Sequence, residues 1–165
     1  TGKVERDKTL VIQGGRIVAI RDGYPTEAGA EVIDLRDSFV LPGLIDSHVH
    51  LTIRSGPGAD LDPVRKVPAD AALDGAVFAG RTLRAGFTTV TDLGGNPDAI
   101  FPLRDAIAAG KIDGPRIVAA GFVGAHGGHG DLQGFRGDIL RLFRSPWLCS
   151  VADGWRRAVR EAVQG

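Results

Sequence analysis

The sequence has few features of an extracellular or membrane protein. Its 165 residues include a single cysteine, Cys149, and no methionine, so neither an intramolecular disulfide nor a cysteine-based zinc site can form. No apolar run approaches the roughly 20 residues that a membrane helix needs, and the first residues lack the basic-then-apolar pattern of a signal peptide. We therefore expect a soluble protein of a reducing compartment, and assign it to the cytoplasm.

An excess of charge of one sign is also absent. Lysine and arginine together number 20, aspartate and glutamate also number 20, and the formal net charge is zero. Without a basic excess, neither nucleic acid nor an anionic membrane surface is an expected partner. The 43% hydrophobic content is that of an ordinary globular chain, whose homo-oligomerisation is left open.

The two ends of the chain suggest a part of something longer. The sequence opens at Thr1-Gly2, almost directly before a strand-like stretch, and stops after a helical pattern that starts near Asp153. In a chain of alternating strands and helices, a further strand would be expected next. We expect the sequence to be truncated.

Glycine is abundant, with 24 residues, and its positions help to predict the elements of the first 43 residues. Gly14-Gly15 separates two apolar runs at residues 9–13 and 16–21, which predicts a β-hairpin. Further strands are predicted at residues 31–35 and 39–41. Because an isolated hairpin is marginal in water, these strands together predict a small antiparallel β-domain.

After residue 43, strand-like runs alternate with helical patterns. The predicted strands and helices are, in order, strand 44–48, helix 70–84, strand 88–92, helix 99–109 with Pro102 in its first turn, strand 116–121 and a last helix from about residue 153. This alternation predicts βαβ units and a parallel sheet, which is an α/β fold.

The strand at residues 44–48 ends in the sequence His48-Val49-His50. Side chains two residues apart on a strand point to the same face, so both imidazoles can converge on one divalent cation. Neutral imidazole suits zinc and similar metals. Such a pair alone is a weak motif, since core or surface histidines can produce it, and its context therefore matters.

That context resembles the amidohydrolase superfamily. Residues 42–50, Pro-Gly-Leu-Ile-Asp-Ser-His-Val-His, resemble the superfamily's motif Pro-Gly-hydrophobic-Ile-Asp-x-His-x-His, which joins a β-sandwich to the first barrel strand. Residues 85–95 and 114–121 look like the second and third barrel strands of one subgroup. That subgroup contains imidazolonepropionase-like enzymes and metal-dependent Xaa-Pro-type dipeptidases. The resemblance covers nearly the whole chain.

The resemblance implies a fold and a metal site. Residues 1–43 would be part of a small β-sandwich domain, and residues 44–165 would be the first three βα units of a (β/α)₈ TIM barrel. The site would hold one or two divalent metal ions, with zinc favoured, and His48 and His50 would be two of the ligands. The remaining ligands and the catalytic acid–base residue are expected beyond Gly165.

The resemblance also implies a reaction. The chain would belong to a metal-dependent hydrolase that cleaves the amide bond of a dipeptide or N-acyl amino acid with a metal-activated water. Its partner would then be a small-molecule or dipeptide substrate. Hydrolysis of a cyclic amide, as in an imidazolonepropionase, is the alternative reaction. A catalytically incomplete fragment is a further alternative, whereas a binding module with a structural metal is disfavoured because two histidines are too few ligands.

A glycine-rich loop, residues 124–131, follows the third predicted strand and reads Gly-Ala-His-Gly-Gly-His-Gly-Asp. A similar loop borders the substrate pocket in the dipeptidase-like subgroup, so the resemblance implies that His129 and His126 bind substrate. A mobile loop whose histidines bond only locally is the rival interpretation. A metal site made by the same two histidines is disfavoured.

Two aspartates lie in the predicted strands that carry the site. Asp92 closes the strand at residues 88–92, where it either caps the following loop, the favoured interpretation, or orients a metal-bound histidine. Asp46 is expected to be structural.

Overall fold

The computed structural model describes residues 2, 4–126, 128–129, 131–132, 134–143 and 147–164. For Phe143 and Gln164 it describes the backbone alone. The chain divides into two compact units, Thr1–Pro42 and Gly43–Gly165. The predicted domain boundary lies between residues 43 and 44, and the assignment of these segments to two domains stays a prediction.

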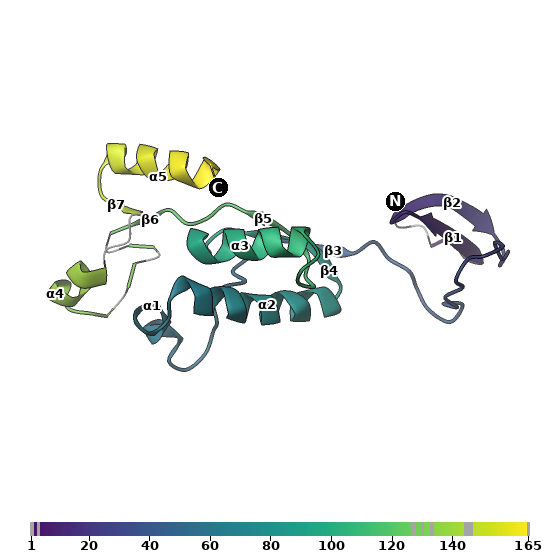
Figure 1. Cartoon of the computed structure of the whole chain (residues 1–165), viewed down its shortest axis with the longest axis horizontal. Coiled ribbons are helices and arrows are strands. Elements are labelled where there is room, and N and C mark those ends of the chain that lie inside the picture. The colour runs from purple at the N-terminus through teal and green to yellow at the C-terminus, as the bar shows by residue number, and fades with distance from the viewer. Residues whose placement is uncertain are drawn as a thin grey trace. The chain divides into compact units, whose positions relative to one another are not determined.

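The first unit is built on one hairpin (Figure 1), in which β1 (Lys8–Gln13) pairs with β2 (Arg16–Asp22) in antiparallel fashion. Gly14 and Gly15 join the strands with φ angles of 58° and 73°. Positive φ at both central residues is what a tight two-residue hairpin turn requires. The predicted hairpin is therefore confirmed.

The strands predicted at residues 31–35 and 39–41 are wrong, because the backbone there forms turns and irregular segments. The Ser38 N–H donates to the Leu35 carbonyl at 2.9 Å and closes one of these turns. Ile33 and Phe39 keep 74% and 76% of their surface exposed. A strand needs a neighbouring strand for its hydrogen bonds, and within the described residues of this unit neither segment pairs with one.

The second unit contains a parallel sheet in the order β3-β4-β5, formed by β3 (Leu44–Val49), β4 (Phe87–Asp92) and β5 (Arg116–Ala119). Helix α2 (Pro68–Arg84) connects the first two strands, and α3 (Pro97–Ala108) connects the second pair. Strands and helices therefore alternate as predicted. The α/β fold class is confirmed.

Local signals explain where α3 begins and ends. The Asn96 side chain accepts a hydrogen bond from the Asp98 N–H at 2.9 Å, and Pro97 occupies the first helical position. Gly110, with a φ of 69°, follows the last turn. The prediction for Pro102 is wrong: it lies inside the helix rather than in the first turn, because the Asn96 cap starts the helix earlier than expected.

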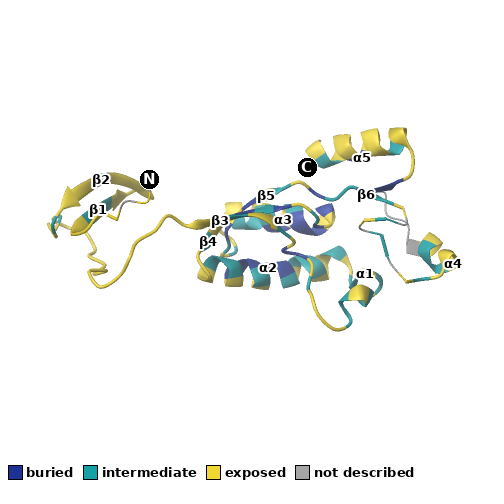
Figure 2. Cartoon of the chain, turned by 180° about the vertical axis from the view of Figure 1, so that it is seen from behind, coloured by how far each residue is buried: buried dark blue, intermediate teal, exposed yellow. Residues whose placement is uncertain are grey.

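The core lies where α2 and α3 pack on the sheet, and the buried residues of these elements gather there (Figure 2). Its buried members are Leu51, Ala79, Val90, Ile100, Leu103 and Ile117. On the strands, Ile45 and Val118 are 71% and 53% exposed. Because strand residues alternate between faces, the sheet has one face covered by helices and one uncovered face.

Shorter elements surround this sheet. The β3–α2 loop holds η1 (Ala59–Leu61) and α1 (Asp62–Arg65). After β5 come β6 (Gly124–Ala125), α4 (Gly137–Leu140), η2 (Arg141–Phe143), β7 (Leu148–Cys149) and α5 (Ala152–Gln164). β6 pairs in parallel with β7, and α5 packs beside β7. None of the helices in the described ranges is long and apolar enough to span a membrane.

Candidate metal centre and substrate pocket

His48 lies near the end of β3 and His50 directly follows it. Val49, between them, packs against the hydrophobic core, whereas both histidines are exposed. Alternation along the strand therefore directs the two imidazoles away from the helix-covered face. Their ring centroids lie 5.2 Å apart, with an interplanar angle of 86°.

The spacing of the two rings fits a shared metal ion. Two imidazoles bound to one tetrahedral zinc, at Zn–N distances of about 2.0–2.1 Å, place their ring centres about 5 Å apart. Among the residues with described placement, no group of three or more His, Cys, Asp or Glu side chains comes together. His48 and His50 thus offer two ligands of a larger set, and their role as ligands stays a prediction.

Asp92 ends β4 and is completely buried. Its Oδ2 accepts a hydrogen bond from the Leu51 N–H at 2.6 Å, while Oδ1 accepts from the N–H groups of Gly94 and Gly95 at 3.2 and 2.8 Å. Gly94 and Gly95 lie in the loop after β4, so Oδ1 caps that loop, as the favoured interpretation predicted, whereas Leu51 lies in the loop after β3. Asp46, on β3, accepts from the His48 backbone N–H at 3.1 Å.

A cavity of about 200 Å³ lies beside His50. It is lined by His50, Ile53, Gly94, Phe122 and His129. These residues follow three successive parallel strands, and the carboxyl ends of parallel strands meet at one edge of a sheet. The cavity therefore brings one predicted metal ligand and one predicted substrate contact to a common space.

The backbone of the glycine-rich loop is held by bonds to β7 and within the loop. The Gly124 N–H donates to the Trp147 carbonyl at 2.9 Å, and the Gly128 N–H donates to the Ala125 carbonyl at 2.9 Å. A Cβ at Gly124 would lie 2.6 Å from the carbonyl oxygen of His129. Glycine at position 124 thus permits the close return of the loop on which His129 sits. Gly127 and Gly130 lie outside the described residues.

The two histidines of this loop differ in placement. His129 lines the cavity with His50, whereas His126 is not among the described residues that line it. The His126 Nδ1 atom lies 3.9 Å from Oδ2 of Asp131. The structure therefore brings His129 to the candidate site. Its role as a substrate contact, and that of His126, stay predictions.

Three further residues line the cavity without a predicted site role, namely Ile53, Gly94 and Phe122. Ile53 and Phe122 carry no motif, since a single apolar residue in a loop is common. Gly94 did carry a signal, because a glycine pair one residue after the end of a strand often marks a close approach of the backbone.

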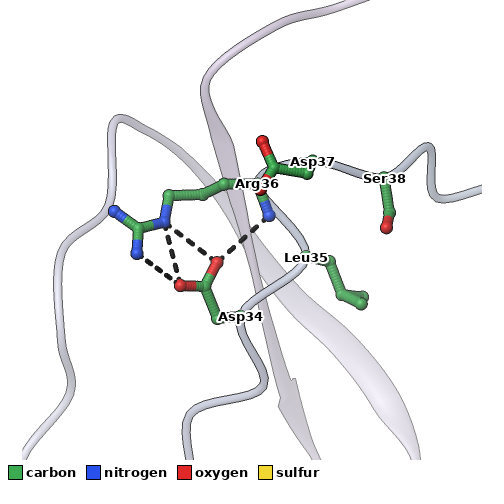
Figure 3. Close-up of a pocket in the computed structure, with 5 residues that line it drawn as sticks. All are labelled: Asp34, Leu35, Arg36, Asp37 and Ser38. Carbon is green, nitrogen blue, oxygen red and sulfur yellow. Dashed lines mark hydrogen bonds and ion pairs between the residues drawn. The ribbon is translucent and has the colours of Figure 1, made fainter.

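A second hollow lies within the first unit, around five consecutive residues, Asp34 to Ser38 (Figure 3). The Arg36 guanidinium is ion-paired with the Asp34 carboxylate, and the Arg36 N–H also donates to Asp34 at 3.1 Å. This pairing lowers the pKa of Asp34 to about 2. The two charged groups satisfy each other and hold this segment in a structured turn.

Comparison with known proteins bears on the chain as a whole. Residues 39–154 match the amidohydrolase family. A curated relative, the 5-methylthioadenosine/S-adenosylhomocysteine deaminase of Symbiobacterium thermophilum, is 32% identical over 142 residues, which cover 75% of this chain and 31% of the relative. Other matching relatives are named dihydroorotase and adenine deaminase.

Solved structures of two peptidases are among those that are similar over nearly all of the chain. A Xaa-Pro dipeptidase with methionine bound in its active site superposes with a TM-score of 0.81 at 33% identity, covering 94% of this chain and 39% of the dipeptidase. A prolidase complexed with N-methylphosphonate-L-proline gives a TM-score of 0.76 at 30% identity, with 95% and 39% covered.

The chain thus spans less than two fifths of the length of these proteins. The matches confirm the predicted fold class, in which the parallel βα units are those of a (β/α)₈ barrel, and the predicted resemblance to Xaa-Pro-type dipeptidases. The chain belongs to the amidohydrolase family, a family of hydrolytic enzymes.

Proposed function

We propose that this chain contributes part of the active site of a metal-dependent dipeptidase, with His48 and His50 as metal ligands and His129 as a substrate contact. The observation that carries the proposal is the cavity that His50 and His129 line together. A metal ligand and a hydrogen-bond donor that line one cavity can act on the same substrate.

The metal is assigned from the family and from the donors present. Members of the amidohydrolase superfamily generally use divalent metal ions, and the 5.2 Å between the two ring centroids is compatible with one such ion. When bound, the ion would activate a water molecule and polarise the substrate carbonyl. His48 and His50 would hold it at the cavity wall, and zinc is the first candidate because imidazole suits it.

The cavity lining indicates which kinds of substrate group it can contact. Ile53 and Phe122 present apolar surface, whereas His129 presents a ring nitrogen that can donate a hydrogen bond. A dipeptide or an N-acyl amino acid with an apolar residue at one end fits this lining.

The similar solved structures support the same substrate class. One is a dipeptidase with methionine bound, and the other is a prolidase complexed with a phosphonate derivative of proline. We therefore place dipeptides that end in proline first, and methionyl-proline in particular.

Hydrolysis of a cyclic substrate, either by opening its ring or by removing an amino group from it, is the second candidate. The curated relatives include proteins named dihydroorotase and deaminase rather than peptidase, so the chemistry of a cyclic substrate has direct sequence support. The cyclic amide reaction of imidazolonepropionases belongs to this class.

A substrate screen with the metal-loaded full-length protein separates these candidates. It should include methionyl-proline and other Xaa-Pro dipeptides, N-acyl amino acids, an imidazolone, dihydroorotate and 5-methylthioadenosine. We expect turnover of dipeptides or N-acyl amino acids, with the highest kcat/KM for a proline-containing dipeptide. Turnover of cyclic substrates alone would move the assignment to the second candidate. A polypeptide of residues 1–165, assayed in parallel, would show whether this chain by itself is catalytically incomplete.

A further inference from the structure

The segment that carries His50 is bonded to the turn after β4 at two points. The buried Asp92 carboxylate accepts the N–H of Leu51, the residue after His50, at 2.6 Å. The Leu93 N–H donates to the carbonyl of Val49, the residue before His50, at 3.3 Å. The backbone on both sides of His50 is therefore tied to the end of the neighbouring strand.

Asp92 also shapes that turn. Its Oδ1 accepts the N–H groups of Gly94 and Gly95, so one carboxylate joins the two loops. Asp92 has no exposed surface, and hydrogen bonds in a buried setting of low dielectric constant are stronger than those in water. Movement of either loop would break at least one of these bonds.

The His50 imidazole itself lies against Gly94. A Cβ built on Gly94 would lie 2.5 Å from Nδ1 of His50 and still closer to Cε1. These atoms belong to a rigid ring, so a side chain at position 94 would force the whole imidazole to turn away from this position. Gly94 also lines the cavity with His50.

We propose that Asp92 and Gly94 act together as positioning residues that fix the direction of the His50 imidazole toward the cavity. Asp92 fixes the backbone on which His50 sits, and the bare Cα of Gly94 is the surface on which the ring lies. The consequence for metal binding rests on the proposed function, because it requires that His50 is a ligand.

The first test is the ring position in the metal-free full-length protein, with ¹³C-labelled histidine and the His50 signal assigned through His50→Asn. In the unsubstituted protein, a nuclear Overhauser effect should join the His50 ring to Gly94. In Gly94→Ala the His50 signal should shift. Gly137→Ala is the matched control, since a Cβ there meets nothing within 4 Å, and it should leave the signal unchanged.

The second test is the affinity for zinc alone, measured by competition with a chelator. Loss of a group that orients a metal ligand typically weakens binding about 10- to 100-fold, and we expect this loss in Gly94→Ala and in Asp92→Asn, but not in Gly137→Ala. In Asp92→Asn the amide NH₂ of the asparagine would face a backbone N–H, so one bond is lost. A circular-dichroism melt shows that each variant is folded at the temperature of measurement.

The two readouts separate the positioning role from the proposed function. An unshifted His50 signal in folded Gly94→Ala, or no Overhauser effect to Gly94 in the unsubstituted protein, would overturn the positioning role. The latter measurement needs no variant, so it stands even if Gly94→Ala does not fold. A displaced ring with unchanged zinc affinity would support positioning by Gly94 and would overturn His50 as a metal ligand.

Discussion

The rings of His48 and His50 meet edge to face, with their centroids 5.2 Å apart and their planes at 86°. If both bind one ion, neither can be replaced by water at equal affinity. Loss of a group that only orients a metal ligand typically weakens metal affinity about 10- to 100-fold. His48→Asn and His50→Asn should each weaken the metal affinity of the full-length protein by more than this, and should therefore lower its metal content. Metal analysis after dialysis, together with an assay of hydrolysis, checks this.

His126→Asn is the matched control. His126 lies in the same unit but is not among the described residues that line the cavity. Its metal content should equal that of the unsubstituted protein. Unchanged metal stoichiometry and full activity in His50→Asn would contradict the assignment.

Local signals in the sequence predicted most of the fold. The glycine pair at residues 14 and 15 marked the hairpin, and Gly110 marked the end of α3, because a positive φ leaves a direct trace in the choice of residue. Segments 31–35 and 39–41 had the composition of strands without becoming strands. Strand formation depends on a partner elsewhere, and composition does not report whether that partner is there.

The candidate site could be predicted only in part. The spacing of His48 and His50 on a strand was enough to place both imidazoles on one face, since the period of a strand is fixed. The approach of His50 to Gly94 depends on how two loops from neighbouring strands meet. The pairing of β6 with β7 likewise joins residues 124–125 to 148–149. Each of these strands is only two residues long, so neither shows an alternation of side chains in the sequence from which the pairing could be predicted.

The β3–α2 loop should lose order at low pH. Arg54 donates to both carboxylate oxygens of Asp62, at 2.5 and 2.9 Å, and Lys66 lies 3.2 Å away. The Arg54 hydrogen bonds, helped by Lys66, lower the pKa of Asp62 from 3.8 to about 2. Because the folded pKa is below the unfolded one, this stabilisation is complete above about pH 4 and is lost as the pH falls toward 2.

Thermal unfolding of the unsubstituted protein and of Asp62→Asn across this pH range checks the prediction. The unsubstituted protein should unfold at the higher temperature at neutral pH, and the difference should narrow between pH 4 and pH 2. Asp113→Asn, which changes an exposed carboxylate elsewhere, is the control. A difference between Asp62→Asn and the unsubstituted protein that does not change with pH would contradict the role of this carboxylate.

Thr52 should be replaceable by valine with a gain in stability. It is 8% exposed, and its hydroxyl oxygen is buried without a hydrogen-bond partner within the described part of the chain. An unpaired buried hydroxyl is destabilising, so Thr52→Val should raise the free energy of unfolding by about 1 kcal/mol. Thr9→Val should do the opposite, because the Thr9 hydroxyl donates to the Gly23 carbonyl at 2.7 Å. Urea denaturation of both variants measures the two signs.

A polypeptide of residues 1–165 alone should self-associate. β3 and β5 are the outer strands of their sheet, and Ile45 and Val118 on these strands are 71% and 53% exposed. Outer strands and exposed apolar surface both favour pairing with other chains. Light scattering at micromolar concentration should detect oligomers, and Ile45→Lys should reduce them. A monodisperse, cooperatively unfolding monomer would contradict this expectation.

Removal of the His129 imidazole should impair catalysis without affecting the metal. His129 shares the cavity with His50, and its backbone is held in the loop because its carbonyl accepts the Ala125 N–H at 3.4 Å. The side chain can therefore be removed while the loop keeps its path. A site that hydrogen-bonds a substrate group loses more from the missing donor than from trimmed apolar contact, so His129→Ala should lower kcat/KM for the preferred substrate about tenfold or more.

Two comparisons make the His129 measurement specific. Metal content in His129→Ala should match that of the unsubstituted protein, since His129 is assigned to the substrate and the metal is assigned to His48 and His50. His126→Ala removes the other imidazole of the same loop, whose Nδ1 lies near Asp131, and should change kcat/KM less than His129→Ala does. Equal losses in both variants would indicate a general disturbance of the loop, and an unchanged kcat/KM in His129→Ala would remove this residue from the substrate site.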